Sequence, residues 1–440
     1  MSGIAEVLLN LNFTVSGSDL VRGETVERLE KLGARVFEGH REQNITGADV
    51  VVASSALRKD NPEVLEAHRR QIPVIPRAEM LAELMRMKYG VAIAGSHGKT
   101  STTAMVSQVL SGAGLDPTIV IGGRLNILGS SAKLGKGDLM VAEADESDGS
   151  FLELAPTIAV VTSINSEHLN HYGSMEALVD AFVGFLNKVP FYGMGVVCLD
   201  DPQIQRIMPR LARTHLTYGL ASQADLVGTD AQFKEFSSRF EVIFRGRWLG
   251  EVTLRVPGRH SVYNALAAIG VGLEFDIKFS QIIEHLAEFT GADRRFQHRG
   301  TIDGVMVIDD YGHHPAEIRA TLAAARDGWK RRTVVVFQPH RYSRLQALME
   351  EFSRSFYQAD VLIVTDVYRA GEEPVPGVSG EAAAEAIKAH GHKDTTYAGS
   401  LEEAVRMARE RTRDGDMLIT LGAGDVWKVA KAFLGEGAWR

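Results

Sequence analysis

The stretch AGSHGKTSTT, residues Ala94 to Thr103, decides the fold of the central part of this chain. It follows the apolar run Val91–Ala94 and precedes the alanine- and valine-bearing segment MVSQVLSGAG. This pattern predicts a strand, a glycine-containing loop and a helix in succession. Backbone N–H groups in such a loop and the first turn of the following helix attract anions. The stretch therefore predicts a phosphate-binding loop.

The loop is tighter than the standard P-loop, G-x-x-x-x-G-K-[ST], whose first glycine would fall at Ile93. Its form here is Gly95-Ser96-His97-Gly98-Lys99-Thr100. Lys99 is placed to reach the β- and γ-phosphates of a nucleotide, and the Thr100 hydroxyl is placed to bind Mg²⁺. His97 is unusual in such a loop. We expect it either to cap the start of the helix or to face a substrate carboxylate.

A magnesium site at this loop needs a carboxylate, and one follows the apolar run LMVA. The segment EADESD, Glu143 to Asp148, lies where parallel strands present ligand-binding residues. Glu143 is the best candidate because it stands directly at the strand end, whereas Asp145, Glu146 and Asp148 are expected only to solvate the turn. The next strand, Ile158–Ile164, is followed by SINSEHLNHYG, which contains His168. Taken alone, His168 is more simply read as structural.

Apolar runs rich in β-branched residues alternate with helical patterns along most of the chain, which predicts an α/β fold with parallel sheets covered by helices. The length of 440 residues suits about three domains. We predict a first domain at 1–88, a central domain at 89–295 and a third, doubly wound domain at 296–440. Within the central domain, residues 225–256 are expected to be antiparallel.

The N-terminus departs from a doubly wound pattern. The opening MSGIAEVLLNLNF indicates an amphipathic helix that leads into the strand TVSGSD, Thr14 to Asp19. A Rossmann-like domain normally begins with a strand and a glycine-rich turn before such a helix. Neither is present, so the first strand of the first domain is expected to be missing.

Composition excludes several classes of protein. A net charge of −8 gives no support to general nucleic-acid binding, which needs a basic surface. No apolar stretch reaches the length of a membrane span, and no signal peptide is evident, so we expect a cytoplasmic enzyme without membrane insertion. Cys198 is the single cysteine and is expected to be a buried, inert thiol.

Seven motifs occur in order along nearly the whole chain: AGSHGKTSTTAM, EADESDGSFL, SINSEHLNHYG, GRHSVYNALAAI, RRFQHRG, DDYGHHPAEI and FQPHRYSR. Together they resemble the signatures of the Mur ligases. This resemblance implies a Rossmann-like domain that binds a UDP-sugar, a central P-loop ATPase-like domain that binds ATP, and a Rossmann-like C-terminal domain that binds an amino acid. It implies an ATP- and Mg²⁺-dependent ligase of peptidoglycan precursors. The nearest branch of the family joins L-alanine to UDP-N-acetylmuramate.

The resemblance also implies roles for individual residues. It assigns nucleotide binding to Gly95, Ser96, His97, Gly98, Lys99, Thr100, Ser101, His260, Asn264, Arg294 or Arg295, and Asp310. It assigns a magnesium ion to Thr100, Glu143 and His168. It assigns substrate binding to Ser2, Asp19, Ser54, Ser55, His97, Tyr311, His313, Arg341 and Arg344, and catalysis to Lys99, His313 and Arg295.

Simpler interpretations of several of these residues stay open. His260 could cap its helix, Asn264 could be a polar surface residue, and Arg341 with Arg344 could form a solvated helix start. The pair His313-His314 precedes Pro315 and could simply form part of a turn.

The chemistry that the resemblance implies begins with a carboxylate, which is a poor electrophile. The γ-phosphoryl group of ATP activates the muramate carboxylate as an acyl phosphate, and the neutral amine of alanine then displaces phosphate. Cations offset the repulsion between the anions in both steps. Acyl phosphates hydrolyse, so we expect the third domain to close on the second and exclude water. His313 is a candidate acceptor for the amine proton.

The sequence departs from the family at the turn that should carry the pyrophosphate, which is cut to Met1-Ser2-Gly3. Either the start is assigned too far downstream or the UDP site is damaged. We favour the first, because a missing central strand leaves two strand edges unpaired.

Other functions also stay open. A murein tripeptide ligase uses the same nucleotide sugar, although that branch typically has tyrosine where this chain has Ser147. The others are a P-loop kinase and a non-catalytic nucleotide-binding protein. The protein is expected to be a monomer or dimer.

Overall fold

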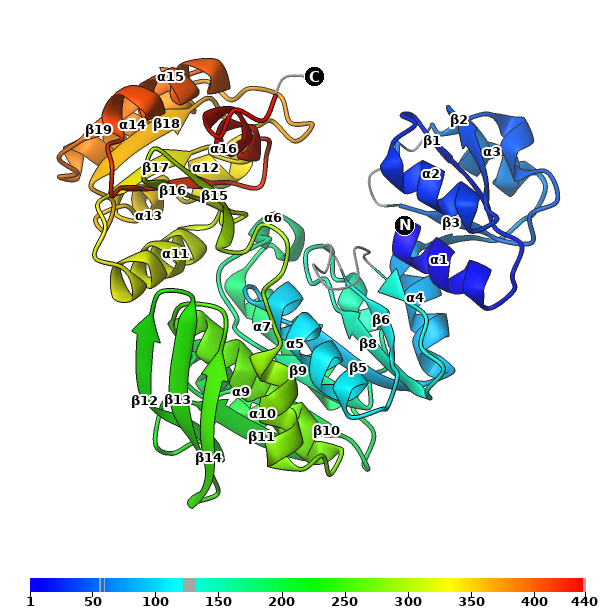
Figure 1. The fold of residues 1–440 in the computed structure, drawn as a ribbon. Coiled ribbons are helices and arrows are strands. Elements are labelled where there is room, and N and C mark those ends of the chain that lie inside the picture. The colour runs from blue at the N-terminus through cyan, green and yellow to red at the C-terminus, as the bar shows by residue number, and fades with distance from the viewer. Residues whose placement is uncertain (55–56, 59, 122–131, 438–440) are drawn as a thin grey trace. The chain divides into compact units, whose positions relative to one another are not determined.

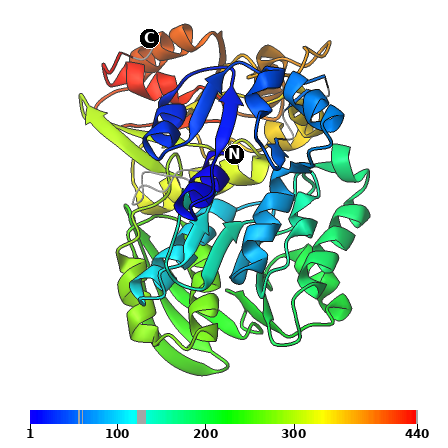
Figure 2. The ribbon, with the colours of Figure 1, turned by 90° about the vertical axis from the view of Figure 1, so that its right-hand side faces the viewer.

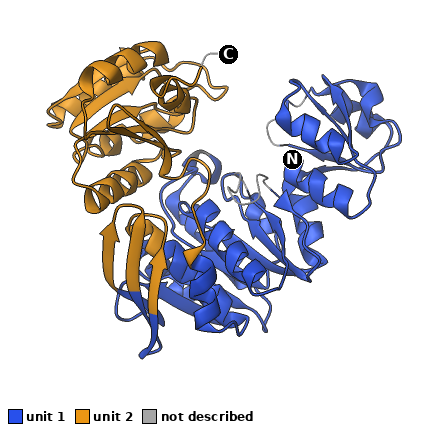
Figure 3. Cartoon of the chain, in the orientation of Figure 1, with its two compact units in different colours: residues 1–229, 241–250, 263–286 blue, residues 230–240, 251–262, 287–440 orange. Residues whose placement is uncertain are grey.

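The computed structural model describes residues 1–54, 57–58, 60–121 and 132–437 (Figure 1). The chain divides into two compact units (Figure 3). Unit 1 comprises residues 1–229, 241–250 and 263–286, and unit 2 comprises residues 230–240, 251–262 and 287–440. Among the described residues, no helix is long and apolar enough to cross a membrane.

The N-terminal part of unit 1, drawn in blue in Figure 1 and Figure 2, contains two separate parallel strand pairs, β1 with β2 and β3 with β4. No hydrogen-bonded ladder joins the two pairs within the described part of the chain. This is the arrangement expected of a doubly wound domain without its first strand. The elements are α1 (Ser2–Asn10), β1 (Ser16–Asp19), α2 (Glu24–Lys31), β2 (Arg35–Glu38), η1 (Glu42–Ile45), β3 (Val51–Ala53), α3 (Pro62–Arg69), β4 (Val74–Pro76) and α4 (Arg77–Arg86).

The central sheet has the strand order β14-β13-β12-β11-β10-β9-β5-β8-β6-β7. Strand β5 lies between β8 and β9 and is parallel to both, so the loops that follow these three strands meet at one edge of the sheet. Every residue of β5 from Gly90 to Ala94 is buried, as a strand covered on both faces requires. The elements are β5 (Tyr89–Ala94), α5 (Lys99–Gly112), β6 (Thr118–Val120), β7 (Ala132–Lys133), β8 (Leu139–Glu143), η2 (Ser150–Glu153), β9 (Ile158–Val161), α6 (Leu169–Tyr172), α7 (Met175–Asn187), β10 (Met194–Cys198), α8 (Pro202–Ile207), η3 (Met208–Arg210) and β11 (His215–Gly219).

Three strands, β12 (Leu226–Lys234), β13 (Ser237–Phe244) and β14 (Arg247–Leu254), extend this sheet, and each runs through both units. Two-residue connections join these neighbouring strands, so they are hairpins and therefore antiparallel, as predicted. Helices α9 (Arg259–Glu274) and α10 (Phe279–Ala287) follow. Cys198 is buried at the end of β10, as predicted, and burial raises the pKa of its thiol to about 12, which disfavours the reactive thiolate.

Unit 2 contains a sheet with the order β15-β16-β20-β17-β18-β19, in which only β15 is antiparallel to its neighbour. Successive residues of β17 alternate between two apolar clusters, so both faces are covered and the predicted doubly wound fold is confirmed. The elements are β15 (Gln297–Ile302), β16 (Val305–Asp310), α11 (Pro315–Gly328), β17 (Thr333–Phe337), α12 (Tyr342–Ala347), α13 (Met349–Ser353), β18 (Val361–Thr365), α14 (Gly380–Ala389), β19 (Thr395–Gly399), α15 (Leu401–Arg411), β20 (Met417–Leu421) and α16 (Trp427–Phe433).

Candidate active site

The phosphate loop joins β5 to α5 and requires its glycines. Gly95 has φ +130° and Gly98 has φ +78°, a region that side chains with a Cβ rarely adopt. A Cβ on Gly95 would overlap the Thr162 hydroxyl, and one on Gly98 would lie 2.6 Å from Asn264 Oδ1. The backbone N–H of Ser96 donates to Ser163 O at 2.9 Å. The loop is therefore held closely against the segment that follows β9.

Lys99 is the first residue of α5, and its ammonium group has two partners. Nζ donates to Gly95 O at 2.7 Å and to Glu146 Oε1 at 2.8 Å. Burial works to lower the pKa of Lys99, but Glu146, and after it Glu143 and Asp145, outweigh burial and hold the pKa above its usual value. Glu146 is only 1% exposed. The prediction that Glu146 solvates the turn is therefore wrong.

Two predicted magnesium ligands lie together, although they are far apart in sequence. The Thr100 hydroxyl, in the first turn of α5, lies 3.2 Å and 3.1 Å from the two carboxylate oxygens of Glu143 at the end of β8. Hydroxyl and carboxylate oxygens are hard donors of the kind that Mg²⁺ prefers, so this pair fits the ion.

The third predicted ligand, His168, lies next to two buried carboxylates. Its Nε2 is 3.8 Å from Glu146 Oε1 and 3.5 Å from Glu167 Oε2. His168 has φ +58°, an uncommon backbone conformation for a residue other than glycine. Residues held in such conformations cluster at functional sites.

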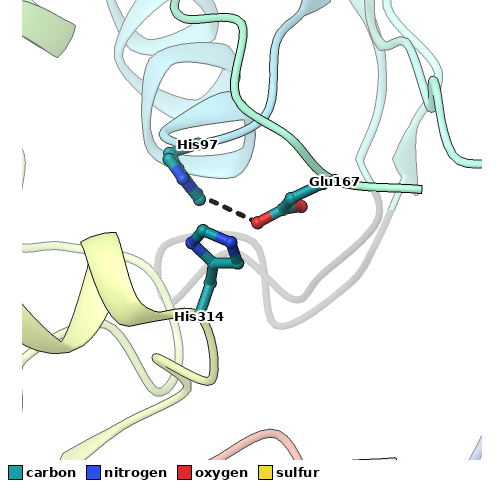
Figure 4. A group of neighbouring side chains, drawn as sticks. All are labelled: His97, Glu167 and His314. Carbon is teal, nitrogen blue, oxygen red and sulfur yellow. Dashed lines mark ion pairs between the residues drawn. The ribbon is translucent and has the colours of Figure 1, made fainter. Parts of the chain in front are cut away.

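His97 does not cap the helix. The residue at the N-cap of α5 is Gly98, so this interpretation of His97 is wrong. The His97 backbone N–H donates to Ser163 Oγ at 3.1 Å, and its carbonyl accepts from Thr162 Oγ1 at 2.5 Å. The ring Nδ1 lies 3.7 Å from Glu167 Oε1 (Figure 4). The imidazole thus lies at the same sheet edge as the phosphate loop.

Asn264 and His260 both lie on α9, and neither fits the simpler interpretation. Asn264 is buried, and its Oδ1 accepts from Thr102 Oγ1 at 3.1 Å, so it is not a polar surface residue. His260 is the second residue of α9 and not its cap. Burial and then Arg295 lower the pKa of His260 to about 4, so its ring is neutral at pH 7. Ser101 lies in the first turn of α5.

The adjacent arginines of unit 2 differ in their surroundings. Arg294 donates to Asp309 Oδ2 at 2.9 Å, to Gly424 O at 3.1 Å and to Gly422 O at 2.6 Å. Arg295 is 30% exposed, and its contact with Glu317 is longer, at 3.4 Å. Arg294 is committed to the interior of unit 2, so Arg295 is the better candidate for a phosphate contact.

Asp310 is also committed to the interior. One carboxylate oxygen accepts from Gly312 N at 2.8 Å and Thr321 Oγ1 at 3.1 Å, and the other accepts from Phe296 N at 2.7 Å. Burial raises the pKa of this carboxyl group. These contacts describe a residue that fixes the start of the loop after β16.

Predicted amino-acid-binding residues gather at the carboxyl ends of β16 and β17. Tyr311 and His313 are in edge-to-face contact, with ring centroids 5.4 Å apart. His313 Nδ1 lies 3.0 Å from Tyr311 O, which fixes the proton on Nδ1 and leaves Nε2 as the acceptor. Burial is the main cause that lowers the pKa of His313 to about 3. His314, in contrast, is the N-cap of α11, with a capping box to Glu317.

Arg344 and Arg341 stand at the start of α12. Arg344 Nη1 donates to His340 Nδ1 at 3.1 Å, and the His340 ring is 5.6 Å from that of His313 and stacks on Tyr368. Arg341 is the exposed N-cap of α12, which agrees with a solvated helix start. Its φ of +69° is nevertheless a strained conformation for a non-glycine residue, held by a hydrogen bond from its N–H to Tyr368 O at 2.9 Å.

The predicted UDP-binding residues lie in the N-terminal part of unit 1. Ser2 is the first residue of α1, and Ser54 follows β3. Asp19 ends β1 and lines a shallow pocket with Arg22, Val26, Val36 and Phe37. Ser55 lies outside the described residues.

Sequence reasoning missed Glu146, His340 and Tyr368. Glu146 is one of four acidic residues in a six-residue segment, which hides it among solvated neighbours. His340 precedes Arg341 in PHRYSR, so its place in the motif was a signal that could have identified it. Tyr368 is brought beside His340 by a parallel bridge between the loops after β17 and β18, and no local pattern predicts that pairing.

Comparison with known proteins matches three family models in order: the Mur ligase family, catalytic domain, at residues 1–89; the Mur ligase middle domain at 93–272; and the Mur ligase, glutamate ligase domain, at 294–424. UDP-N-acetylmuramate–L-alanine ligase of Syntrophotalea carbinolica is 55% identical, covering 98% of this chain and 94% of that one. The enzyme of the same name from Geobacter sulfurreducens is 56% identical, covering 99% and 95%. The crystal structure of UDP-N-acetylmuramate-alanine ligase from Thermotoga maritima is 28% identical, with a TM-score of 0.83 and coverage of 99% and 96%.

Proposed function

The chain belongs to the Mur ligase family, and we propose that it joins L-alanine to the lactyl carboxylate of UDP-N-acetylmuramate as ATP is converted to ADP and phosphate, a step of peptidoglycan precursor synthesis. The observation that carries this proposal is near-full-length identity of 55–56% to relatives of that name. The phosphate loop, with Lys99 and Thr100 at the start of α5, supports the ATP chemistry.

In the first step, the muramate carboxylate attacks the γ-phosphorus of ATP and ADP leaves, which gives an acyl phosphate. Two anions must approach one another, so the step depends on fixed positive charge. Lys99, kept protonated by its carboxylate neighbours, and Arg295 would supply it. Thr100 and Glu143 would hold Mg²⁺ with His168 nearby, and this ion would further neutralise the phosphate oxygens.

In the second step, the neutral alanine amine attacks the acyl carbon, the bond from that carbon to the phosphate oxygen breaks, and the departing phosphate carries away the amine proton. The planar guanidinium of Arg344, with Arg341 beside it, suits a bidentate contact with the alanine carboxylate. The Nε2 of His313 would accept a hydrogen bond from the amine. A pKa of about 3 makes His313 a weak base, so holding the neutral amine in place is a better role for it than full proton removal.

The test is phosphate release from ATP with Mg²⁺ and UDP-N-acetylmuramate, measured with L-alanine, with a murein tripeptide and with no amine. Phosphate release that requires L-alanine supports the proposal. Release that requires the tripeptide contradicts it and indicates a murein tripeptide ligase. Lys99→Met should abolish release, while Lys136→Met, at an exposed lysine, should not change it. ATP binding without release under any condition contradicts the ligase assignment for this chain.

A further inference from the structure

We propose that Glu146 acts as a stand-in anion: its carboxylate pairs with Lys99 when no nucleotide is bound, and the phosphates of the nucleotide must displace it. The inference rests on the proposed function only in that Lys99 meets nucleotide phosphates. It gives Glu146 a positioning role that differs from that of the magnesium ligands.

The pairing of the two side chains is direct and buried. Lys99 Nζ lies 2.8 Å from Glu146 Oε1, and the side chains are 16% and 1% exposed. Glu146 Oε2 is buried without a hydrogen-bond partner among the described residues. A carboxylate placed so far from water needs a cation, and Lys99 is the cation that it contacts.

Two hydrogen bonds fix the backbone of Glu146, so only its side chain has to move when the phosphates displace the carboxylate from Lys99. The Glu146 carbonyl accepts from the Tyr172 hydroxyl at 2.5 Å and from Gly149 N at 3.1 Å. Tyr172 belongs to α6, the short helix that begins directly after His168. These contacts tie the acidic turn after β8 to the segment after β9.

Charge makes the two partners of Lys99 competitors. A bound nucleotide brings several negative charges to the loop, and each is repelled by a carboxylate that stays in place at low dielectric. Part of the attraction between Lys99 and phosphate is therefore spent on separating Lys99 from Glu146. In return, Lys99 is never a buried and uncompensated charge in the nucleotide-free protein.

The neighbours of Glu146 define the alternatives. His168 Nε2 lies 3.8 Å from its Oε1, so Glu146 could instead help to bind a metal ion. The experiment is therefore done without Mg²⁺, so that an effect on metal binding cannot contribute. ADP binding to the full-length protein is measured by calorimetry with EDTA present and without muramate or alanine.

Under these conditions, Glu146→Gln should bind ADP about tenfold more tightly than the unmodified protein, a modest effect for a close charge pair. The matched control is Asp148→Asn, which removes the same charge from an exposed carboxylate two residues away, and its effect should be within twofold. In a Lys99→Met background, Glu146→Gln should no longer tighten binding. Glu146→Asp keeps the charge and should bind ADP nearly as the unmodified protein does.

Three results would overturn the proposal. One is equal ADP affinity in Glu146→Gln and Asp148→Asn. Another is weaker binding by Glu146→Gln, which indicates that the carboxylate supports the site. The last is equal tightening with and without Lys99, which indicates a general effect of charge. If Glu146→Gln fails to fold, ADP binding ten times tighter by Glu146→Asp would also overturn it. Because no ligase substrate is present, these results are independent of the ligase assay.

Discussion

The Thr100 hydroxyl lies 3.1 Å from a carboxylate oxygen of Glu143, although 43 residues separate the two in sequence. Strands β5 and β8 are parallel neighbours, so the residue that ends β8 and the first turn of α5 meet at one edge of the sheet. We expect Glu143→Gln to lower the rate of phosphate release by about a hundredfold and to raise the Mg²⁺ concentration needed for half-maximal rate. A titration of the ligase assay with Mg²⁺ measures both effects. An unchanged Mg²⁺ requirement would remove Glu143 from the metal site.

We expect Arg294 to contribute mainly to the stability of unit 2 and Arg295 mainly to the binding of ATP. Arg294→Ala removes the cation that pairs with the Asp309 carboxylate, which is 1% exposed and would keep the hydrogen bond from Thr420, and we expect a loss of about 3–5 kcal/mol in the free energy of unfolding. Arg295→Ala should change that free energy little and raise the KM for ATP. Denaturant unfolding and steady-state kinetics of both variants test the assignment. The reverse pattern would make Arg294 the phosphate ligand.

We expect His340 to contribute to the binding of L-alanine and not to the binding of ATP. Its Nδ1 accepts from Arg344, and its ring stacks on Tyr368 with an angle of 10° between the planes. His340→Phe keeps an aromatic ring but removes the acceptor, so we expect the KM for L-alanine to rise about tenfold and the KM for ATP to stay unchanged. Tyr368→Phe keeps the stacked ring and serves as the control. A joint rise in both KM values would indicate a general structural defect.

Most strands that the sequence predicted in the central and third domains are buried along nearly their whole length, whereas β1, predicted within Thr14–Asp19, is mostly exposed. Residues Val334 to Phe337 of β17 are buried on both faces, and such runs can be read from sequence. Strands β15 (QHRGTI) and β19 (TTYAG) were not predicted, because each is an edge strand with polar residues or glycine and only one neighbour. Their strand character comes from the sheet that they join and not from their own side chains.

The candidate site was also predictable only in part, because some of its features depend on contacts between segments that are distant in sequence. The residues of the phosphate loop are adjacent in sequence, so their pattern is local. The direction of Glu146 depends on a turn in which Gly149 has φ +73° and on the contact with Tyr172, and neither can be read from EADESD. Likewise, adjacent residues such as Arg294 and Arg295 differ only in the groups that the fold brings to them.

The buried histidines of unit 2 should make its stability sensitive to acid. Burial is the main cause that lowers the pKa of His313 to about 3 and that of His260 to about 4, whereas the unfolded chain titrates near 6.5. Between these values the unfolded state binds more protons than the folded state, so the free energy of unfolding rises with pH. The two neutral histidines therefore make their full contribution to the free energy of unfolding above pH 6.5. This contribution falls as the pH drops toward 4, by at most about 1.4 kcal/mol per pH unit for each histidine. Asp309 and Asp310 have raised pKa values and act in the opposite direction, so the histidines must be isolated by substitution. We would measure the free energy of unfolding by denaturant between pH 7.5 and 5. It should depend less steeply on pH in the double variant with His260→Gln and His313→Gln than in the unmodified protein. Equal slopes would show that these rings take up protons in the folded state.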